Sequence, residues 1–172
     1  DQILNNWYTS PSSIPTSFEI IRSSNNESLR FFAAKCLRYF IINHIDSFSE
    51  ENIEDMANLF SEFILENQNR VDSADTKYIM ISLADLCGIF SQLIDSAIKT
   101  FPPDIFLYIL GLLAEEAEEP YYHALYNADN HISDYINQFK DIIYQYLSEA
   151  PYSSLWAQSF QRAFHFFLKP ID

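Results

Sequence analysis

The sequence predicts an all-α protein, and three observations support this expectation. Only 2 of the 172 residues are glycine, whereas sheets joined by tight turns use glycine where the backbone needs a positive φ. Apolar residues recur at helical spacing in one segment after another. No segment alternates apolar and polar residues over the length of a strand between turn signals. With 48% hydrophobic residues, the chain also has enough material for one sizeable core.

The first two expected helices run from about residue 14 to 22 and from about 26 to 46. The first carries Phe18 and Ile21 on one side, and Asn25 and Asn26 are candidate N-caps for the second. The second helix is apolar on more than one face: Leu29, Phe32, Ala33, Cys36, Leu37, Phe40 and Ile41 follow one helical spacing, and Phe31, Tyr39, Ile42 and Ile45 fill another face. Such a helix needs several neighbours, and the strip expected to face water consists of Arg30, Lys35 and Arg38.

The third expected helix, residues 49–69, is amphipathic. Ser49 is its candidate N-cap, and acids follow in the first turn, where the helix dipole favours them. Its apolar stripe consists of Ile53, Met56, Ala57, Phe60, Phe63 and Ile64. The opposite side is acidic and expected to be exposed, with Glu54, Asp55, Asn58, Glu62 and Glu66.

The same alternation continues along the chain. Residues 76–90 are apolar nearly all round, and residues 92–101 form a shorter amphipathic segment. Residues 102–119 are again apolar all round and begin with two prolines, which suit a helix start. Residues 133–148 are amphipathic, and one more aromatic-rich helix is expected near the end. About seven helices are therefore predicted.

Helices that are apolar all round alternate with amphipathic helices that have a single apolar stripe. They form pairs, and the spacing between pairs is in the range of helical repeats of roughly 40 residues. In a stacked solenoid, one helix of each pair is covered on several faces because each repeat packs against its neighbours. The pattern therefore predicts a HEAT-like α-α superhelix of stacked antiparallel helix pairs, with an irregular bundle as the alternative. Residues 1–172 are expected to form a single helical-repeat domain, the N-terminal fragment of a longer solenoid.

The charge balance restricts the class of partner. The chain has 24 Asp and Glu against 10 Lys and Arg, a formal net charge of -14. Phosphate binding needs a basic surface, so no direct nucleic-acid ligand is expected, and basic partners are favoured. The longest apolar run, residues 105–114, is about half the length that a bilayer span requires, so no membrane association is expected.

Candidate chemical groups are few, and we expect no enzyme activity, no cofactor and no metal site. His44, His123, His131 and His165 fall on different segments rather than at metal-ligand spacing, although Asp129 lies between two of them. Cys36 and Cys87 sit in apolar helical patterns, which is typical of buried, reduced thiols. The sequence has no Gly-rich phosphate loop and no nucleophile elbow.

Several strings resemble the N-terminal HEAT repeats of importin-β-type nuclear transport receptors, in particular the transportin-SR and importin-thirteen branch. They are the Phe-Ala-Ala helix around residues 32–37, the Leu-Ala-Asp-Leu helix at residues 83–86 and the Ile-Leu-x-Leu-Leu-x-Glu-Glu helix end at residues 109–116. Their order and spacing match over about residues 17–119. Residues 1–8 correspond at most to the tail of the family's first helix.

The resemblance implies a receptor that shuttles between nucleus and cytoplasm, carries cargo through nuclear pores and is switched by the GTPase Ran in its GTP form. In that family the inner helices contact Ran, and here these correspond to residues 49–69, 92–101 and 133–148. The polar residues that the resemblance assigns to Ran or cargo binding are Glu54, Asp55, Asn58, Glu62, Asp95, Lys99, Asp134 and Asp141.

Two further partner classes follow from the same resemblance. An acidic concave face suits basic cargo, by complementary charge. Tyr39, Ile42 and Tyr78 are candidates for a shallow groove that binds the Phe-Gly repeats of nucleoporins, although packing between repeats explains them as well. Two other classes of function remain open: a helical-repeat scaffold for cytosolic complexes without Ran dependence, and a helical-bundle enzyme with an unrecognised site.

Overall fold

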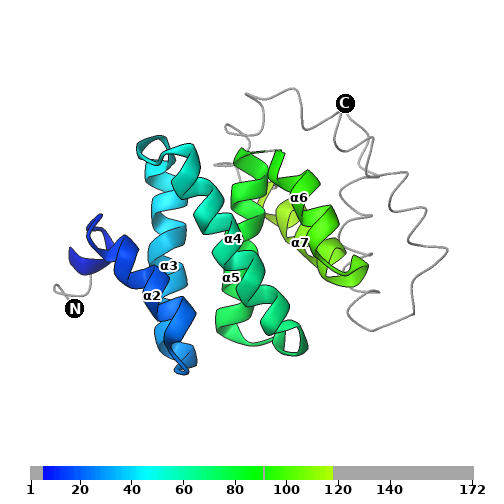
Figure 1. Ribbon diagram of the computed structural model, residues 1–172, viewed down its shortest axis with the longest axis horizontal. Coiled ribbons are helices and arrows are strands. Elements are labelled where there is room, and N and C mark those ends of the chain that lie inside the picture. Colours follow the sequence, from blue (N-terminus) through cyan, green and yellow to red (C-terminus); the bar gives the residue numbers. More distant parts are fainter. Residues whose placement is uncertain (1–5, 91, 118–172) are drawn as a thin grey trace. The chain divides into compact units, whose positions relative to one another are not determined.

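The computed structural model describes residues 6–90 and 92–117 of the chain. The chain divides into two compact units, residues 1–86 and residues 87–172, which are described separately below. Every regular element within the described residues is a helix (Figure 1). The predicted all-α class is therefore confirmed.

The first unit contains α2 (Ser13–Ser23), α3 (Glu27–His44), α4 (Glu50–Glu66) and most of α5 (Ala74–Ile89). Short 3-10 turns, η1 (Ile45–Ser47) and η2 (Gln68–Arg70), precede α4 and α5. These bounds agree with the sequence-based expectations to within a few residues.

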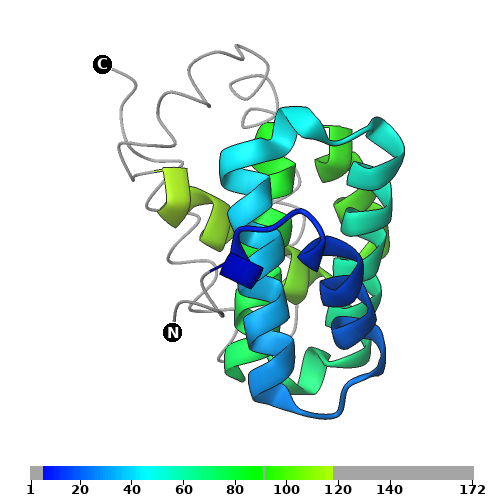
Figure 2. The same cartoon turned by 90° about the vertical axis from the view of Figure 1, so that its left-hand side faces the viewer.

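Successive helices of the first unit run in opposite directions. In Figure 1, α3 and α5 rise through the view while α4 descends. Turned by 90°, the unit shows α3 and α5 in one layer and α2 and α4 in a second layer beside it (Figure 2). Contacts between α2 and α3 join the two layers, and α2 also contacts α4 within the second layer. Within this unit, the expected antiparallel helix pairs of a helical-repeat fragment are present.

Side-chain caps explain where α3 and α4 begin. The side-chain oxygen of Asn26 accepts a hydrogen bond from the backbone N–H of Leu29, at 3.1 Å. Ser49 accepts in the same way from the N–H of Asn52, at 3.2 Å. Each cap satisfies a backbone donor that has no partner within its helix. Of the two candidate caps for α3, the structure therefore selects Asn26.

The core of the first unit lies between its two layers. Residues with no exposed surface come from both layers: Ala33, Ala34, Cys36, Leu37, Ile41, Met56, Phe60, Ile64, Ile79, Met80, Ala84 and Leu86. Leu29 departs from its expected place on the apolar stripe of α3, because its side chain is 49% exposed. It lies in the first turn of the helix, beside the Asn26 cap, where the chain has just turned out of α2.

The second unit contains α6 (Gln92–Thr100) and α7 (Pro103–Ala117), which contact each other. Proline occupies the first position of α7, where its missing N–H removes no helical hydrogen bond, as the sequence predicts. Residues 105–109 are all buried, so α7 is covered on every side. The helices expected at residues 133–148 and near the end of the chain lie outside the described residues. None of the described helices is long and apolar enough to cross a membrane.

Candidate interaction surface on α4

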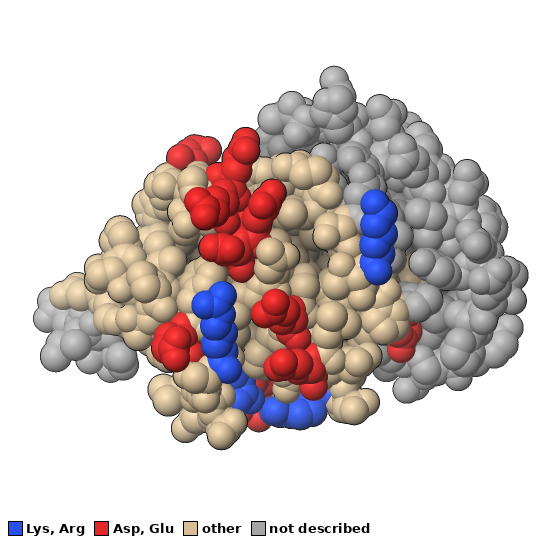
Figure 3. Space-filling model, in the orientation of Figure 1, with Lys and Arg blue, Asp and Glu red and all other residues tan. Residues whose placement is uncertain are grey.

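The exposed side of α4 carries a continuous acidic surface, which we call the α4 acidic face. Its members recur every three or four residues along the helix, and all of them are exposed: Glu51, Glu54, Asp55, Asn58, Glu62 and Glu66. In the space-filling view, Asp and Glu side chains gather along the part of the surface that α4 forms (Figure 3). The four residues of this helix that the resemblance assigns to binding therefore share one face.

The opposite side of α4 fixes the orientation of this face. Ile53, Met56, Phe60 and Ile64 are buried against the rest of the first unit. Because helical residues three and four apart lie on the same side, burying this stripe turns the acidic positions outward. The helix cannot rotate without exposing Met56 and Phe60, both of which have no exposed surface.

Of the four remaining residues that the resemblance assigns, Lys99 alone has a side chain within the described part of the chain. Lys99 is exposed in the last turn of α6, in the second unit. The side chain of Asp95 is not among those that the structure describes. Asp134 and Asp141 lie outside the described residues.

The expected exposed strip of Arg30, Lys35 and Arg38 on α3 is wrong. Arg30 is buried, and its Nε and Nη2 atoms lie 2.7 Å and 2.6 Å from Asp75 Oδ2. Arg38 is half-buried, with its Nε 2.7 Å from Asp85 Oδ2. Lys35 is half-buried near the rings of Tyr8 and Phe31. The physical reason is that α5, which appeared apolar all round, carries two buried carboxylates that draw both arginines inward.

Arg30 joins four parts of the first unit. Besides Asp75 at the start of α5, it donates from Nη1 to the carbonyl oxygen of Ser24, after α2, at 2.7 Å. Its guanidinium also lies over the ring of Phe63 on α4, 5.5 Å from the centroid. A planar guanidinium has five N–H donors in a fixed arrangement, so one side chain can serve several partners.

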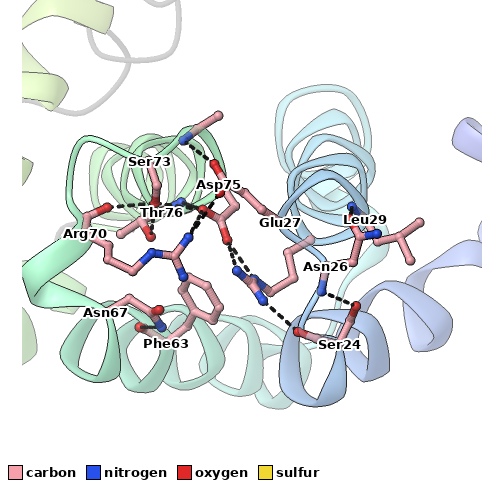
Figure 4. A network of polar contacts seen from close by, with 12 residues as sticks. Ser24, Asn26, Glu27, Leu29, Phe63, Asn67, Arg70, Ser73, Asp75 and Thr76 are labelled. Carbon is pink, nitrogen blue, oxygen red and sulfur yellow. Dashed lines mark hydrogen bonds and ion pairs between the residues drawn. The ribbon is translucent and has the colours of Figure 1, made fainter.

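The carboxylate of Asp75 is satisfied on both oxygens (Figure 4). Its Oδ1 accepts from the N–H of Thr76 at 2.9 Å and lies 2.8 Å from the hydroxyl of Ser73. Burial alone would raise the pKa of Asp75, but the hydrogen bonds from Ser73, Arg30 and Thr76 outweigh burial and hold that pKa below its ordinary value.

An exposed pair extends the same network at the N-terminal ends of α3 and α5. Arg70 Nη2 lies 3.2 Å from Glu27 Oε2, and Glu27 Oε1 accepts from the backbone N–H of Ala74 at 3.3 Å (Figure 4). Both side chains of the pair are nearly half exposed, so solvent screens their attraction. The exposed pair therefore contributes little to the stability of the first unit.

Half-buried aromatic side chains cover the outer side of α3. The ring of Tyr39 packs against Tyr8 at a centroid distance of 5.2 Å, and Tyr78 of α5 meets Phe31 edge-on at 5.1 Å. Ile42, the third candidate for a Phe-Gly groove, is also half-buried. These contacts are packing within the first unit, and the structure does not test whether the same side chains bind a partner.

Two groups, the buried thiol of Cys36 and the half-buried phenol of Tyr8, have raised pKa values. Burial raises the pKa of the Cys36 thiol to about 11. Burial, followed by the nearby Tyr78, raises the pKa of Tyr8 to about 12. Both groups are therefore neutral at physiological pH. Neither one has the reactivity of its ionised form, the thiolate or the phenolate.

No cluster of three metal-ligating side chains occurs within the part of the chain that the structure describes. His123, Asp129 and His131, the residues weighed as a metal site, lie outside that part. Cys36 and Cys87 are both buried and free of disulfide bonds, as expected for packing thiols.

Comparison with known protein families gives one match. Residues 1–68 match the family model of the importin-beta N-terminal domain. Comparisons with curated proteins and with solved structures give no significant match. The matched region includes α2, α3 and α4, and therefore the whole α4 acidic face. The family model does not separate branches, so the transportin-SR and importin-thirteen branch stays a prediction.

Proposed function

We propose that residues 1–68, which match the model of the importin-beta N-terminal domain, are the N-terminal region of an importin-β-type nuclear transport receptor, and that the chain belongs to such a receptor. The receptor binds Ran in its GTP form and helps to carry protein cargo through nuclear pores. The family match is the observation that carries this proposal, because in importin-β proteins this N-terminal region is where Ran-GTP binds. The function is binding and release, without a catalytic step or a cofactor.

The α4 acidic face is the proposed contact surface for Ran or basic cargo in the first unit. Its residues Glu54, Asp55, Asn58 and Glu62 are exposed on one side of a helix whose other side is fixed by burial. Carboxylates held on a rigid helix attract basic side chains, and they accelerate association more than they raise affinity. We extend the proposed surface to four residues further along the chain: Asp95, Lys99, Asp134 and Asp141.

Two further parts of the proposal concern transit through the pore. Tyr39, Ile42 and Tyr78 are the proposed contacts for Phe-Gly repeats of nucleoporins, since they are half-buried apolar side chains on the α3 and α5 layer. A receptor of this kind shuttles between nucleus and cytoplasm, and that localisation is part of the proposal.

Calorimetric titration of the 172-residue chain with Ran tests the proposal. Ran loaded with a non-hydrolysable GTP analogue is expected to bind, and Ran loaded with GDP is expected to bind much more weakly. Circular dichroism on the same sample verifies that the helices are folded. Equal binding of both forms, or no binding by a folded chain, would overturn the receptor proposal and favour a helical scaffold that works without Ran.

A further inference from the structure

Two buried charge pairs connect α3 to α5 at different heights. Arg30 pairs with Asp75 near the N-terminal ends of both helices, and Arg38 pairs with Asp85 further along. Both aspartate side chains have no exposed surface. Both arginines come from α3 and both carboxylates from α5, so the two helices run parallel at this contact, as Figure 1 also shows.

Apolar packing between these helices leaves their relative position weakly specified. Buried residues occur on every side of α5, including the consecutive run from Ser82 to Cys87. Helix α3 likewise has buried or half-buried residues at every position from 30 to 42. A helix that is apolar all round has no polar edge to fix its rotation. Many nearby arrangements would therefore bury similar apolar area.

The two charge pairs together allow far fewer arrangements. Residues 30 and 38 are separated by about 12 Å along α3, and residues 75 and 85 by about 15 Å along α5, from the rise of 1.5 Å per residue. Moving α5 by one turn in one direction would place Tyr78 or Ile79 opposite Arg30. Moving it one turn in the other direction would place Ile81 or Ser82 opposite Arg38. The first shift leaves the buried guanidinium of Arg30 without a carboxylate, and the second leaves the half-buried guanidinium of Arg38 without one.

A gain in stability alone does not explain why charge pairs occur in the interior. Removing two charges from water is costly, and well-packed apolar residues of similar size often replace a buried pair with no loss of stability. The cost of a mismatched pair is much larger, because it leaves an isolated charge in the interior. A buried pair therefore penalises wrong arrangements more than it stabilises the right one.

We propose that the Arg30–Asp75 and Arg38–Asp85 pairs specify the register of α3 against α5, that is, their relative rotation and displacement along the helix axes. Arg30 extends this role beyond the two helices, since it also contacts Ser24 and the ring of Phe63 on α4. The register of α3 and α5 thereby also sets the position of α4. This role concerns the first unit alone and does not depend on the proposed function.

A spin-label distance between α3 and α5 tests the register directly. Labels are placed on cysteines introduced at Asn43 and Lys77, both of which are exposed. Cys36 and Cys87 are changed to alanine in every chain so that no other thiol is labelled. Because Arg30 faces Asp75, residue 32 of α3 lies level with residue 77 of α5. Position 43 is eleven residues further along α3, so the two labels differ in height by roughly 16 Å along the helix axes. A displacement of one turn, about 5.4 Å, would therefore change the measured distance.

The test variant removes both pairs at once: Arg30→Met, Arg38→Met, Asp75→Asn and Asp85→Leu. Asparagine at position 75 keeps an oxygen for the N–H of Thr76. The labelled parent chain, which keeps both charge pairs, is expected to give one narrow distribution of label-to-label distances. The variant is expected to remain helical but to give a broad distribution or several distances. The matched control, Glu27→Gln, removes the charge of the exposed Glu27–Arg70 pair at the start of α3 while leaving Arg70 beside Asp75, and it is expected to keep the single distance.

Three results would overturn the proposal. A single narrow distance in the variant, equal to that of the parent, would mean that apolar packing sets the register. A variant that does not fold would mean that the pairs contribute stability that apolar residues cannot replace. Equal broadening in the exposed-pair control would mean that the effect does not belong to the buried pairs.

Discussion

At the scale of single residues, burial determines what the charged groups of this chain do. Asp75 and Asp85 are fully buried and each faces an arginine, whereas Glu54 and Glu62 are exposed on α4. Carboxylates therefore have two roles here. The buried ones organise the interior of the first unit, and the exposed ones are available to partners.

Replacing Asp75 by asparagine should destabilise the chain in a pH-dependent way. The change leaves the buried Arg30 without its counter-charge, which typically costs about 3–5 kcal/mol near neutral pH. Because the pKa of Asp75 in the folded chain is lowered, its stabilisation is present above the ordinary pKa of aspartate and is lost as the pH falls through the folded value.

The measurement is urea unfolding of the wild type and of Asp75→Asn from pH 7 down to acid. The difference in free energy of unfolding should be largest at neutral pH and should shrink below about pH 4. The matched control is Asp72→Asn, which changes an exposed carboxylate near the same turn. A difference that stays constant with pH would show that the charge of Asp75 contributes nothing.

Cys36 should react slowly with thiol reagents in the folded chain. Its side chain has no exposed surface, and burial raises the pKa of its thiol to about 11, so almost no thiolate exists at neutral pH. Labelling with a chromogenic disulfide in a Cys87→Ala background isolates this thiol. The rate should rise by several orders of magnitude on adding denaturant. Prompt labelling of the folded chain would mean that α3 is exposed by local opening.

At the scale of elements, the caps give the clearest relation between sequence and helix boundary. The Asn26→Ala change removes the side-chain oxygen that accepts the N–H of Leu29, and it should cost about 1 kcal/mol of stability. The neighbouring Asn25→Ala provides a matched control, because Asn25 is exposed and the α3 cap hydrogen bond comes from Asn26. Thermal unfolding of both variants measures the difference. Equal losses would mean that Asn26 acts through something other than its cap.

Helix positions were predictable because their signals are local. The caps at Asn26 and Ser49, and the proline at the start of α7, depend on residues within one turn of the boundary. The exposed side of α4 was equally predictable, since its acids follow the helical period on the side opposite an apolar stripe.

The interior polar network was not predictable, because it depends on contacts between distant residues. Arg30 and Asp75 are 45 positions apart, and Arg38 and Asp85 are 47 apart. On α3 alone, three basic residues on an otherwise apolar helix indicate a solvent-facing strip. The signal that could have corrected this interpretation lies on α5, where Asp75 and Asp85 interrupt an apolar helix without an exposed side to accommodate them.

At the scale of the whole molecule, the formal net charge of -14 acts on any charged partner before contact. Such a field accelerates association with basic surfaces and slows association with acidic ones, and salt screens it over a Debye length of about 8 Å at physiological ionic strength. The overall charge and the α4 acidic face make different predictions. The overall charge acts equally from any side, whereas a contact surface depends on where its charges lie.

Reversing charge on α4 should therefore slow association with Ran-GTP, or with a Lys- and Arg-rich cargo peptide, more than reversing charge elsewhere. The variant Glu54→Lys with Glu62→Lys is compared with Glu19→Lys and Asp72→Lys, which change the net charge equally at exposed positions outside α4. Stopped-flow association at several salt concentrations should show a lower rate and a weaker salt dependence for the α4 variant, with the dissociation rate less affected, because exposed charges act mainly on encounter. If both variants slow association equally, the net charge alone directs the encounter, and α4 is no longer part of the contact surface. That outcome would leave the match of residues 1–68 to the importin-beta N-terminal domain unchanged, because the match extends over three helices rather than one exposed face.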